Sequence, residues 1–464
     1  MRQDKIFALL AYLIQALSTL GVVFAVSHFL DATSYGRYSL VVATSQTVAV
    51  FAAEWIRLGA LRFCAANADD MHQRVSTIQS VFFGICAALA LLVTGLGLAG
   101  VMPMHEALLG LTVAVLMGAT DLQLVFLRVR GSFNGFAKLQ CARAITLLLS
   151  STAGAMATHS QVGALAGLAI GYLVSMAMFV SADPSWWRLD LSGFSPSFLK
   201  QLAIYGMAAA GASMIHSLVP MGMRWTGQSV MTAAEFAAFS LAIDLLQRPF
   251  ALVTSAIGGI VTPGVIKEFE EKLKPHLPKL KQMYEVQFWA VIVLMGGALA
   301  FIPEVAQWAI KDAMSAGFER VGAVVAMIFG AHIVVQTIMA TPGHLLKSGH
   351  GLIANAVVEV ILVGLACLAG LVFDALRPLD WLWLVLGAVV LCDLFGARLM
   401  RRVPCEFPTA LALTGPVVAV AMGLFNLWDT NDDWQMGLLK CLAFAVLTGA
   451  CGLWVKRMVK AKAV

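Results

Sequence analysis

Charge is scarce in this sequence. Only 12% of the 464 residues are charged, whereas 60% are hydrophobic and the mean hydropathy is +0.85. A typical soluble domain has roughly twice that share of charged residues, about 25%. So few charges cannot cover a water-soluble surface, and the same figures exclude a disordered chain, a coiled coil and a secreted disulfide scaffold. The composition therefore predicts a protein that crosses a membrane many times.

Motifs of several membrane enzymes and pumps are also absent. There is no phosphate-binding Gly-Lys-Ser/Thr motif, so we do not expect this chain to hydrolyse ATP. Residues 61–74 lack the Gly-rich Asp-Arg signature of the major facilitators, and no His/Cys cluster has metal-ligand spacing. No large loop of the kind expected in a polysaccharide polymerase or a lipid-linked glycosyltransferase is present. We therefore expect no enzyme activity, no metal or other cofactor and no nucleic-acid partner.

Apolar stretches long enough to cross a membrane make up most of the chain. About 20 residues are needed, because ~30 Å of hydrocarbon is crossed at ~1.5 Å per residue. The first stretch is too long for a signal-peptide core, so we interpret it as an uncleaved helix. Fourteen stretches qualify, near 6–30, 38–59, 77–101, 107–127, 141–159, 162–182, 203–220, 234–258, 286–303, 321–342, 352–373, 380–398, 409–427 and 436–455.

The basic residues predict how these spans are oriented. Lysine and arginine concentrate in the cytoplasmic loops of membrane proteins. With the N-terminus inside, 24 of the 31 basic residues fall on the inner side, and Arg248 and Lys440 lie within spans. Both termini are therefore expected to be cytoplasmic. None of the eight cysteines falls in an outer loop, so no disulfide is expected. Five basic residues fall on the outer side: Arg37, Arg224, Lys311, Arg320 and Arg377.

Two short segments resemble each other at an offset of 201 residues. Tyr35-Gly-Arg-Tyr-Ser-Leu40 opens the second span and Phe236-Ala-Ala-Phe-Ser-Leu241 opens the eighth. Both enter the membrane from the outside, six helices apart, and transporters are often built from such repeats. We therefore expect two parallel six-helix lobes, a cytoplasmic linker, and two additional helices followed by a basic tail. The boundaries are 1–182 and 203–402 for the lobes, 183–202 for the linker and 403–464 for the added helices.

This layout and three short motifs resemble the oligosaccharide flippases of polysaccharide biosynthesis. The segment Phe29–Leu40 is similar to that family's stretch ending in Tyr-Gly-x-Tyr after the first helix. Tyr205-Gly206 and the segment Trp55–Phe63 are partial matches. These Wzx-like proteins belong to the multidrug/oligosaccharidyl-lipid/polysaccharide (MOP) superfamily, which also contains the MATE exporters. The resemblance in layout covers the whole chain.

The resemblance implies an inner-membrane flippase. Such a protein moves an undecaprenyl-diphosphate-linked oligosaccharide to the outer leaflet by alternating access, for exopolysaccharide, capsule or O-antigen synthesis. Its partners would be this substrate, membrane lipids, and the polysaccharide polymerase and export machinery, with protons or sodium ions coupling the cycle. The alternative is a MATE-like cation-coupled multidrug exporter, which is expected to have an acidic, aromatic-lined cavity without arginines. The mixed charges within the spans favour the anionic cargo.

Ionisable side chains within spans are the candidate functional residues, because each is costly to place in hydrocarbon. Asp244 and Arg248 lie four residues apart, hence on one helix face. They form either a neutralised ion pair that locks the packing or a charged cavity wall that responds to substrate or protons. Arg57 and Arg143 lie near the inner ends of their spans. They are either ordinary charges on the cytoplasmic side or residues at the inner mouth of the cavity, where a diphosphate would enter. Arg224 is either outer surface charge or part of the cavity.

Carboxylates within the spans are the candidates for ion coupling. Asp121 has no basic residue one turn away, so it either carries a proton or pairs with an arginine of a neighbouring helix. Glu359 shares a helix face with Asn355, which we assign to the cavity, and Asp393 is a further coupling candidate. One other pair, His332 and Gln336, also shares a face, and we interpret it as a hydrogen-bonded packing pair.

Overall fold

All the regular structure of the described residues is helical. The computed structural model describes residues 2–64, 70–100, 103–180, 193–272, 278–338, 349–373, 376–400, 409–427 and 434–461, and no strand occurs among them. The chain divides into two compact units, Met1–Trp225 and Thr226–Val464. The predicted division into lobes, linker and two added helices stays a prediction.

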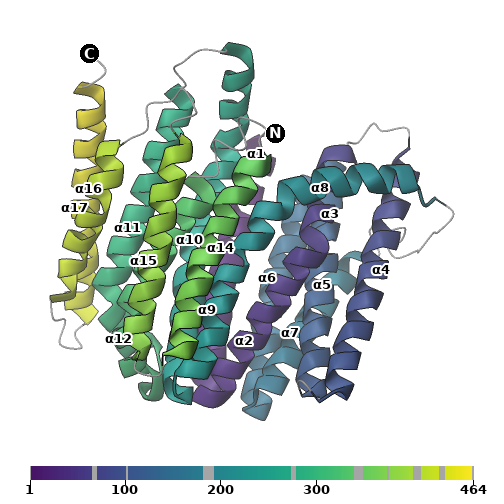
Figure 1. Cartoon of the computed structure of the whole chain (residues 1–464), viewed down its shortest axis with the longest axis horizontal. Helices are drawn as coiled ribbons and strands as arrows, with labels where there is room; N and C mark the ends of the chain where they lie inside the picture. The colour runs from purple at the N-terminus through teal and green to yellow at the C-terminus, as the bar shows by residue number, and fades with distance from the viewer. Residues whose placement is uncertain are drawn as a thin grey trace. The chain divides into compact units, whose positions relative to one another are not determined.

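The first unit is built from the helices up to the middle of α9 (Figure 1). Within it α6 packs along both α1 and α7, α5 packs on α2, α4 and α7, and α3 packs on α8. The elements are α1 (Arg2–Phe29), α2 (Ala32–Ala49), a π-helical turn η1 (Val50–Glu54), α3 (Trp55–Phe63), α4 (Met71–Leu98), α5 (Met104–Val129), α6 (Phe133–Thr158), α7 (Gln161–Val180), α8 (Pro196–His216) and α9 (Leu218–Val230).

The second unit begins within α9 and contains the remaining helices. Here α10 packs on α11 and α12, α15 packs on α12 and α14, and α16 and α17 both contact α11. The elements are α10 (Ala233–Lys272), α11 (Pro278–Ala309), α12 (Asp312–Ile333), a π-helical turn η3 (Val334–Ile338), α14 (Gly349–Val372), α15 (Pro378–Met400), α16 (Thr409–Gly423), a 3-10 turn η4 (Leu424–Leu427) and α17 (Trp434–Ala461).

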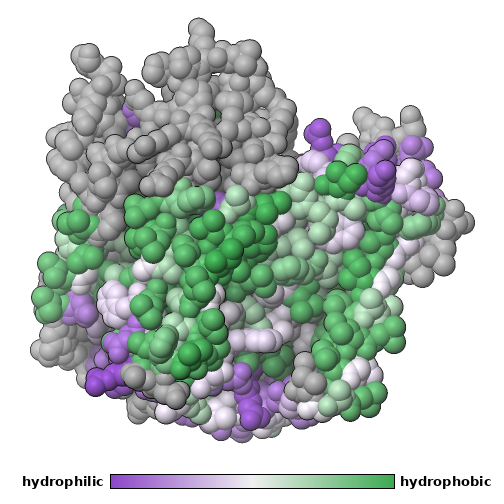
Figure 2. All heavy atoms as spheres, in the orientation of Figure 1, coloured by the Kyte–Doolittle hydropathy of each residue, from purple (hydrophilic) through white to green (hydrophobic). Residues whose placement is uncertain are grey.

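Within the described residues, each of the fourteen predicted spans lies on a helix or on consecutive helical elements. The predicted span 38–59, for example, is α2, η1 and α3 in succession, and 203–220 falls on α8 and α9. The ends of three predicted spans, residues 101, 181–182 and 339–342, lie outside the described residues. Among the described residues, nine helical segments are long and apolar enough to cross a membrane. Figure 2 shows hydrophobic residues over much of the visible surface. Leu91 and Val446 are among the exposed large hydrophobic residues. The expected all-α polytopic membrane fold is confirmed.

Polar residues placed between the apolar stretches determine where several helices begin. Asp31 accepts a hydrogen bond from the Ser34 amide at 2.6 Å and caps α2. Ser195 caps α8 in the same way, with Pro196 at the first helical position. These caps satisfy backbone amides that would otherwise have no partner at a helix start.

The repeated sequence segment occupies equivalent positions in the two units. It starts at the fourth residue of α2 in one copy and at the fourth residue of α10 in the other, and its aromatic side chains are buried in both. Tyr38 packs near Tyr35, with ring centroids 6.3 Å apart, and Phe239 packs on Trp381 at 5.9 Å. The serine of each copy, Ser39 or Ser240, is also buried. The two segments are therefore alike in their position within the helix and in their burial, whereas their aromatic partners differ.

Helices α6 and α7 approach closely because glycine recurs every four residues on α7. A Cβ atom added to Gly171 would lie 2.9 Å from the Thr146 carbonyl oxygen of α6, and one added to Gly167 would lie 3.0 Å from Ser151 Cα. Thr146 also donates a hydrogen bond to the Gly171 carbonyl oxygen at 2.9 Å. Small residues allow such backbone contacts in membranes, where lipid supplies no hydrophobic drive for helix association.

Candidate functional site

The first unit contains a polar network that joins three membrane helices. Arg143 on α6 is buried, and its Nη1 donates to Asp121 Oδ1 on α5 at 2.6 Å. Its Nη2 donates to Gln140 Oε1 at 3.2 Å, and Gln140 Nε2 donates to Gln15 Oε1 on α1. The network therefore holds a guanidinium and a carboxylate among α1, α5 and α6.

This network lies well away from the turn that joins α5 and α6, although the predicted span 141–159 places Arg143 near its inner end. Asp121 is eight residues before the end of α5, and Arg143 is ten residues after the start of α6. At 1.5 Å per residue, both side chains are about 12–15 Å from the turn that joins these helices. Of the two alternatives for Asp121, the structure shows the pairing with a neighbouring arginine. A paired carboxylate is neutralised in place, which hydrocarbon requires.

The second unit contains a separate cluster of buried polar side chains. His332 Nδ1 on α12 lies 2.8 Å from Glu359 Oε1 on α14, and both residues are buried. Asn355, one turn before Glu359, donates from Nδ2 to the Val335 carbonyl oxygen of η3 at 3.4 Å. Asp393 on α15 is near enough to interact electrostatically with Glu359. Two carboxylates, an imidazole and an amide thus converge from α12, α14 and α15.

This cluster has the chemistry to bind a cation. Asn355 Oδ1 and Asp393 Oδ1 are buried, and neither has a hydrogen-bond partner among the described residues. Two neighbouring carboxylates in an apolar interior repel each other unless a cation, a proton included, lies between them. The predicted coupling candidates Glu359 and Asp393 are therefore brought together, with His332 beside them.

His332, which the sequence pairs with Gln336, also contacts a neighbouring helix. Its Nδ1 lies 2.8 Å from Glu359 Oε1. The π-helical turn η3 begins at Val334, between His332 and Gln336. The packing pair of His332 and Gln336 stays a prediction.

A third buried pair was not predicted. Lys440 Nζ on α17 donates to Glu304 Oε1 on α11, and both residues are buried. Lys440 Nζ also lies 5.4 Å from the Phe301 ring centroid. The predicted span ended at Pro303, whereas α11 continues through that proline to Ala309 and so places Glu304 within the helix.

The other predicted cavity residues are distributed between the two units. Arg57 on α3 forms an ion pair with Glu54 in η1. Arg224 on α9 is buried rather than exposed. On α10, Asp244 is buried and Arg248 is half-buried. Both interpretations of this α10 pair, the ion pair and the charged cavity wall, stay predictions.

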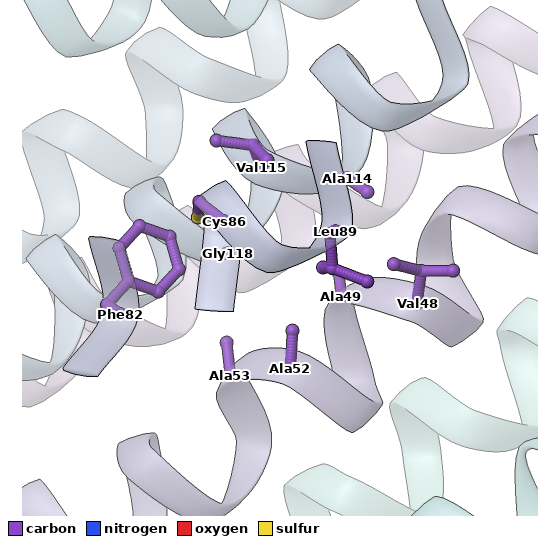
Figure 3. A pocket seen from close by; sticks show the side chains of 10 residues that line it. All are labelled: Val48, Ala49, Ala52, Ala53, Phe82, Cys86, Leu89, Ala114, Val115 and Gly118. Atoms are coloured by element: carbon purple, nitrogen blue, oxygen red, sulfur yellow. The ribbon is translucent and has the colours of Figure 1, made fainter. Parts of the chain in front are cut away.

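One small pocket lies beside the π-helical turn η1. Figure 3 shows its lining side chains, which come from α2, η1, α4 and α5 and are all apolar. The cavity is about 10 Å³, room for about one water molecule. Since no polar group points into it, this pocket does not bind an ion or a headgroup. Its lining is Val48, Ala49, Ala52, Ala53, Phe82, Cys86, Leu89, Ala114, Val115 and Gly118.

The fold is similar to those of solved membrane transporters. The lipid II flippase MurJ in an inward closed conformation has a TM-score of 0.73 at 11% identity, over 99% of this chain and 100% of its own. The MATE multidrug transporter DinF-BH has a TM-score of 0.57 at 14% identity, over 86% of this chain and 94% of its own. A MOP-superfamily transporter from Pyrococcus furiosus has a TM-score of 0.51 at 13% identity, over 90% of this chain and 94% of its own.

These similarities show that the chain has the fold of these solved structures. No protein-family model matches this sequence, and no curated protein sequence matches it. The similarity to solved structures at these identities describes architecture, so the cargo must be argued from the side chains.

Proposed function

We propose that this protein is an inner-membrane flippase. Its cargo would be an undecaprenyl-diphosphate-linked oligosaccharide repeat unit, moved to the outer leaflet by alternating access for exopolysaccharide, capsule or O-antigen synthesis. Both termini would lie in the cytoplasm, and the polymerase and export machinery would receive the product. The sugar and the diphosphate are too polar to cross hydrocarbon unaided, so a protein path is required.

The observation that carries the proposal is the extent of the structural similarity. The lipid II flippase matches 99% of this chain, whereas the MATE transporter DinF-BH matches 86%. Both have the superfamily fold, but the flippase match extends over nearly the whole chain, whose last described helices are α16 and α17. This supports a flippase-like layout of the chain, and the arginines inside the spans support a lipid-linked cargo over a small drug.

Arginines inside the spans fit the diphosphate of such a cargo. A guanidinium donates forked, charge-assisted hydrogen bonds to phosphate oxygens. Arg143, held in its network by Asp121 and Gln140, has a fixed orientation for that role. The other proposed cavity residues are Arg57, Arg224, Asp244, Arg248 and Asn355.

The cluster of His332, Glu359 and Asp393 supplies the proposed coupling site in the second unit. Binding of a proton or a sodium ion there would neutralise a carboxylate inside the membrane, which changes the preferred environment of α14 and α15. Asp121 would couple in the first unit if the cargo displaced it from Arg143. Glu359→Gln would then abolish the dependence of transport on an ion gradient.

A deletion strain tests the proposal. Lipid-linked oligosaccharide should accumulate while surface polysaccharide disappears, and the wild-type gene should reverse both effects. Asp244→Ala and Arg248→Ala should fail to restore polymer although the protein reaches the membrane in normal amount. Normal export with both variants would remove these residues from the cavity, and unchanged glycolipid and polymer in the deletion strain would overturn the flippase proposal.

The alternative is a cation-coupled multidrug exporter, favoured by the similarity to MATE transporters over most of the chain. That function predicts increased susceptibility of the deletion strain to cationic dyes, with unchanged glycolipid. Arginines in the proposed cavity would disfavour a cationic cargo, because like charges repel in a medium of low dielectric constant.

A further inference from the structure

A pocket with two arginines lies within the second unit, where α10, α12 and α15 come together. Its volume is about 440 Å³. The helices α10 and α12 pack against each other, as do α12 and α15 (Figure 1). The lining residues are Met231, Glu235, Gly317, Arg320, Val321, Arg377, Pro378 and Leu379. Three of these are charged, and two of the three are arginines.

The one acidic residue in the lining is already engaged. Glu235 Oε2 accepts hydrogen bonds from the Thr232 amide at 3.1 Å and the Thr232 hydroxyl at 2.9 Å, in the capping box that starts α10. Its Oε1 lies 3.7 Å from Arg320 Nη1, an ion pair too long for a hydrogen bond. Most of the donors of Arg320 therefore remain available. Arg377 has no ion-pair partner among the described residues.

Packing fixes the walls of this pocket. Trp381, one turn after Arg377, is fully buried and packs edge-on against Phe239 of α10 at 5.9 Å. Gly317 brings α12 so close to α10 that an added Cβ would lie 2.7 Å from Ala238 Cβ. The two guanidiniums are thus attached to backbones that are held in place before any ligand binds.

The predicted topology places this pocket on the outer side, where basic residues are disfavoured. Only five basic residues fall on that side, and Arg320 and Arg377 are two of them. Planar guanidiniums recognise phosphate by forked hydrogen bonds. We propose that this pocket binds a phosphate or diphosphate group through Arg320 and Arg377. The group belongs either to an anionic lipid headgroup or to a diphosphate, and the proposal does not depend on which cargo is transported.

Titration calorimetry with inorganic pyrophosphate tests the site. The full-length protein is reconstituted in phosphatidylcholine nanodiscs, which carry no net lipid charge. Arg320→Gln and Arg377→Gln should each weaken binding about 3–10-fold, and the double variant should weaken it at least tenfold. Glu235→Gln should strengthen binding severalfold, because it removes the competing charge while an amide still completes the capping box.

The matched control is Arg37→Gln, another arginine of the predicted outer side, which pairs with Glu106 at 3.9 Å and does not line the pocket. It should bind pyrophosphate as the wild type does. Absence of saturable binding to the wild type, equal loss with Arg37→Gln, or weaker binding by Glu235→Gln would each overturn the proposal.

Native mass spectrometry distinguishes the two sources of the phosphate. After reconstitution with phosphatidylglycerol, the wild type should retain one lipid more than the double variant if a headgroup occupies the pocket. Equal retention, together with arginine-dependent pyrophosphate binding, assigns the pocket to a diphosphate instead. The deletion-strain phenotype tests the proposed cargo separately, so failure of one proposal leaves the other standing.

Discussion

At the residue scale, several ionisable side chains among the described residues pair with a group of the opposite type. Asp121 pairs with Arg143, Glu359 with His332 and Glu304 with Lys440. Each pair joins two different helices, and each member is costly in hydrocarbon without the other. The pairs therefore fix helix packing, and any transport role must use charges that packing has already placed.

Removing one member of the Asp121–Arg143 pair should separate these two roles. Arg143→Gln leaves the Asp121 carboxylate without its partner and should lower the stability of the protein. The loss should be smaller than the ~3–5 kcal/mol typical of a fully buried pair, because the Asp121 side chain is 26% exposed. The double variant Asp121→Asn/Arg143→Gln should recover the melting temperature but not polysaccharide export, because the guanidinium is missing. Recovered export would show that the pair is structural only.

Cys64, which ends α3 outside the predicted span, should react slowly with maleimides. Burial raises the pKa of the Cys64 thiol to about 11, against a smaller lowering by Arg74. Less than about 1% of the Cys64 side chain is then in the thiolate form near pH 7.5. The labelling rate should rise as the pH approaches 11. In single-cysteine proteins, Arg62→Cys at an exposed position of the same helix is the control. Equal labelling rates at pH 7.5 would contradict this account.

The sequence identified charged residues inside the spans better than it identified the residues that they contact. Asp121, Glu359 and Asp393 are recognisable because a charge in an apolar span is unusual. Their partners come from other helices, and a single sequence carries no signal for contacts across helices. Gln15 and Gln140 were missed for a simpler reason: an amide inside an apolar helix is common and costs less than a charge.

At the element scale, the spans were predictable because hydropathy alone determines them. The ends of the spans and their local geometry were less predictable. Helix α11 continues through Pro303, and the predicted span 38–59 contains a π-helical turn that hydropathy does not detect. Both deviations matter, since one brings Glu304 into the bundle and the other shifts the faces of the helix that follows. Local geometry of this kind depends on tertiary packing.

The glycine-mediated packing of α6 on α7 should not tolerate a large side chain. Gly167→Leu would drive its side chain into the backbone at Ser150 and Ser151, and should lower stability by more than about 2 kcal/mol. Gly364→Leu on α14 is the matched control, because no atom lies within 4 Å of the position its Cβ would take. Thermal unfolding of the purified proteins gives both values. Similar melting temperatures for the two variants would contradict the close approach.

The Lys440–Glu304 pair should hold α17 against α11. Lys440→Met leaves a buried carboxylate unpaired and should destabilise the protein by about 3–5 kcal/mol. Replacing both members, in Glu304→Met/Lys440→Met, should restore most of that stability because no uncompensated charge remains. A double variant as unstable as Lys440→Met would show that the ion pair is not what positions α17.

At the scale of the whole molecule, the layout of spans is what the sequence carries most strongly. Fold similarity to the lipid II flippase covers nearly the full chain at only 11% identity, and no family model matches. Many different apolar side chains satisfy a membrane helix equally well. A few positions accept fewer residue types, such as the buried aromatic pairs near the start of α2 and of α10. The fold therefore constrains the cargo less than individual charged side chains inside the spans do.

The most direct measurement of the central claim is lipid translocation by the purified protein in liposomes. Undecaprenyl-diphosphate-linked oligosaccharide is placed in one leaflet, and its exposure on the other is followed with a sugar-cleaving enzyme. The account predicts rapid translocation by the wild type, none with Asp244→Ala/Arg248→Ala, and no movement of ethidium in the same vesicles. Ethidium transport driven by an ion gradient, without any acceleration of the lipid, would contradict it.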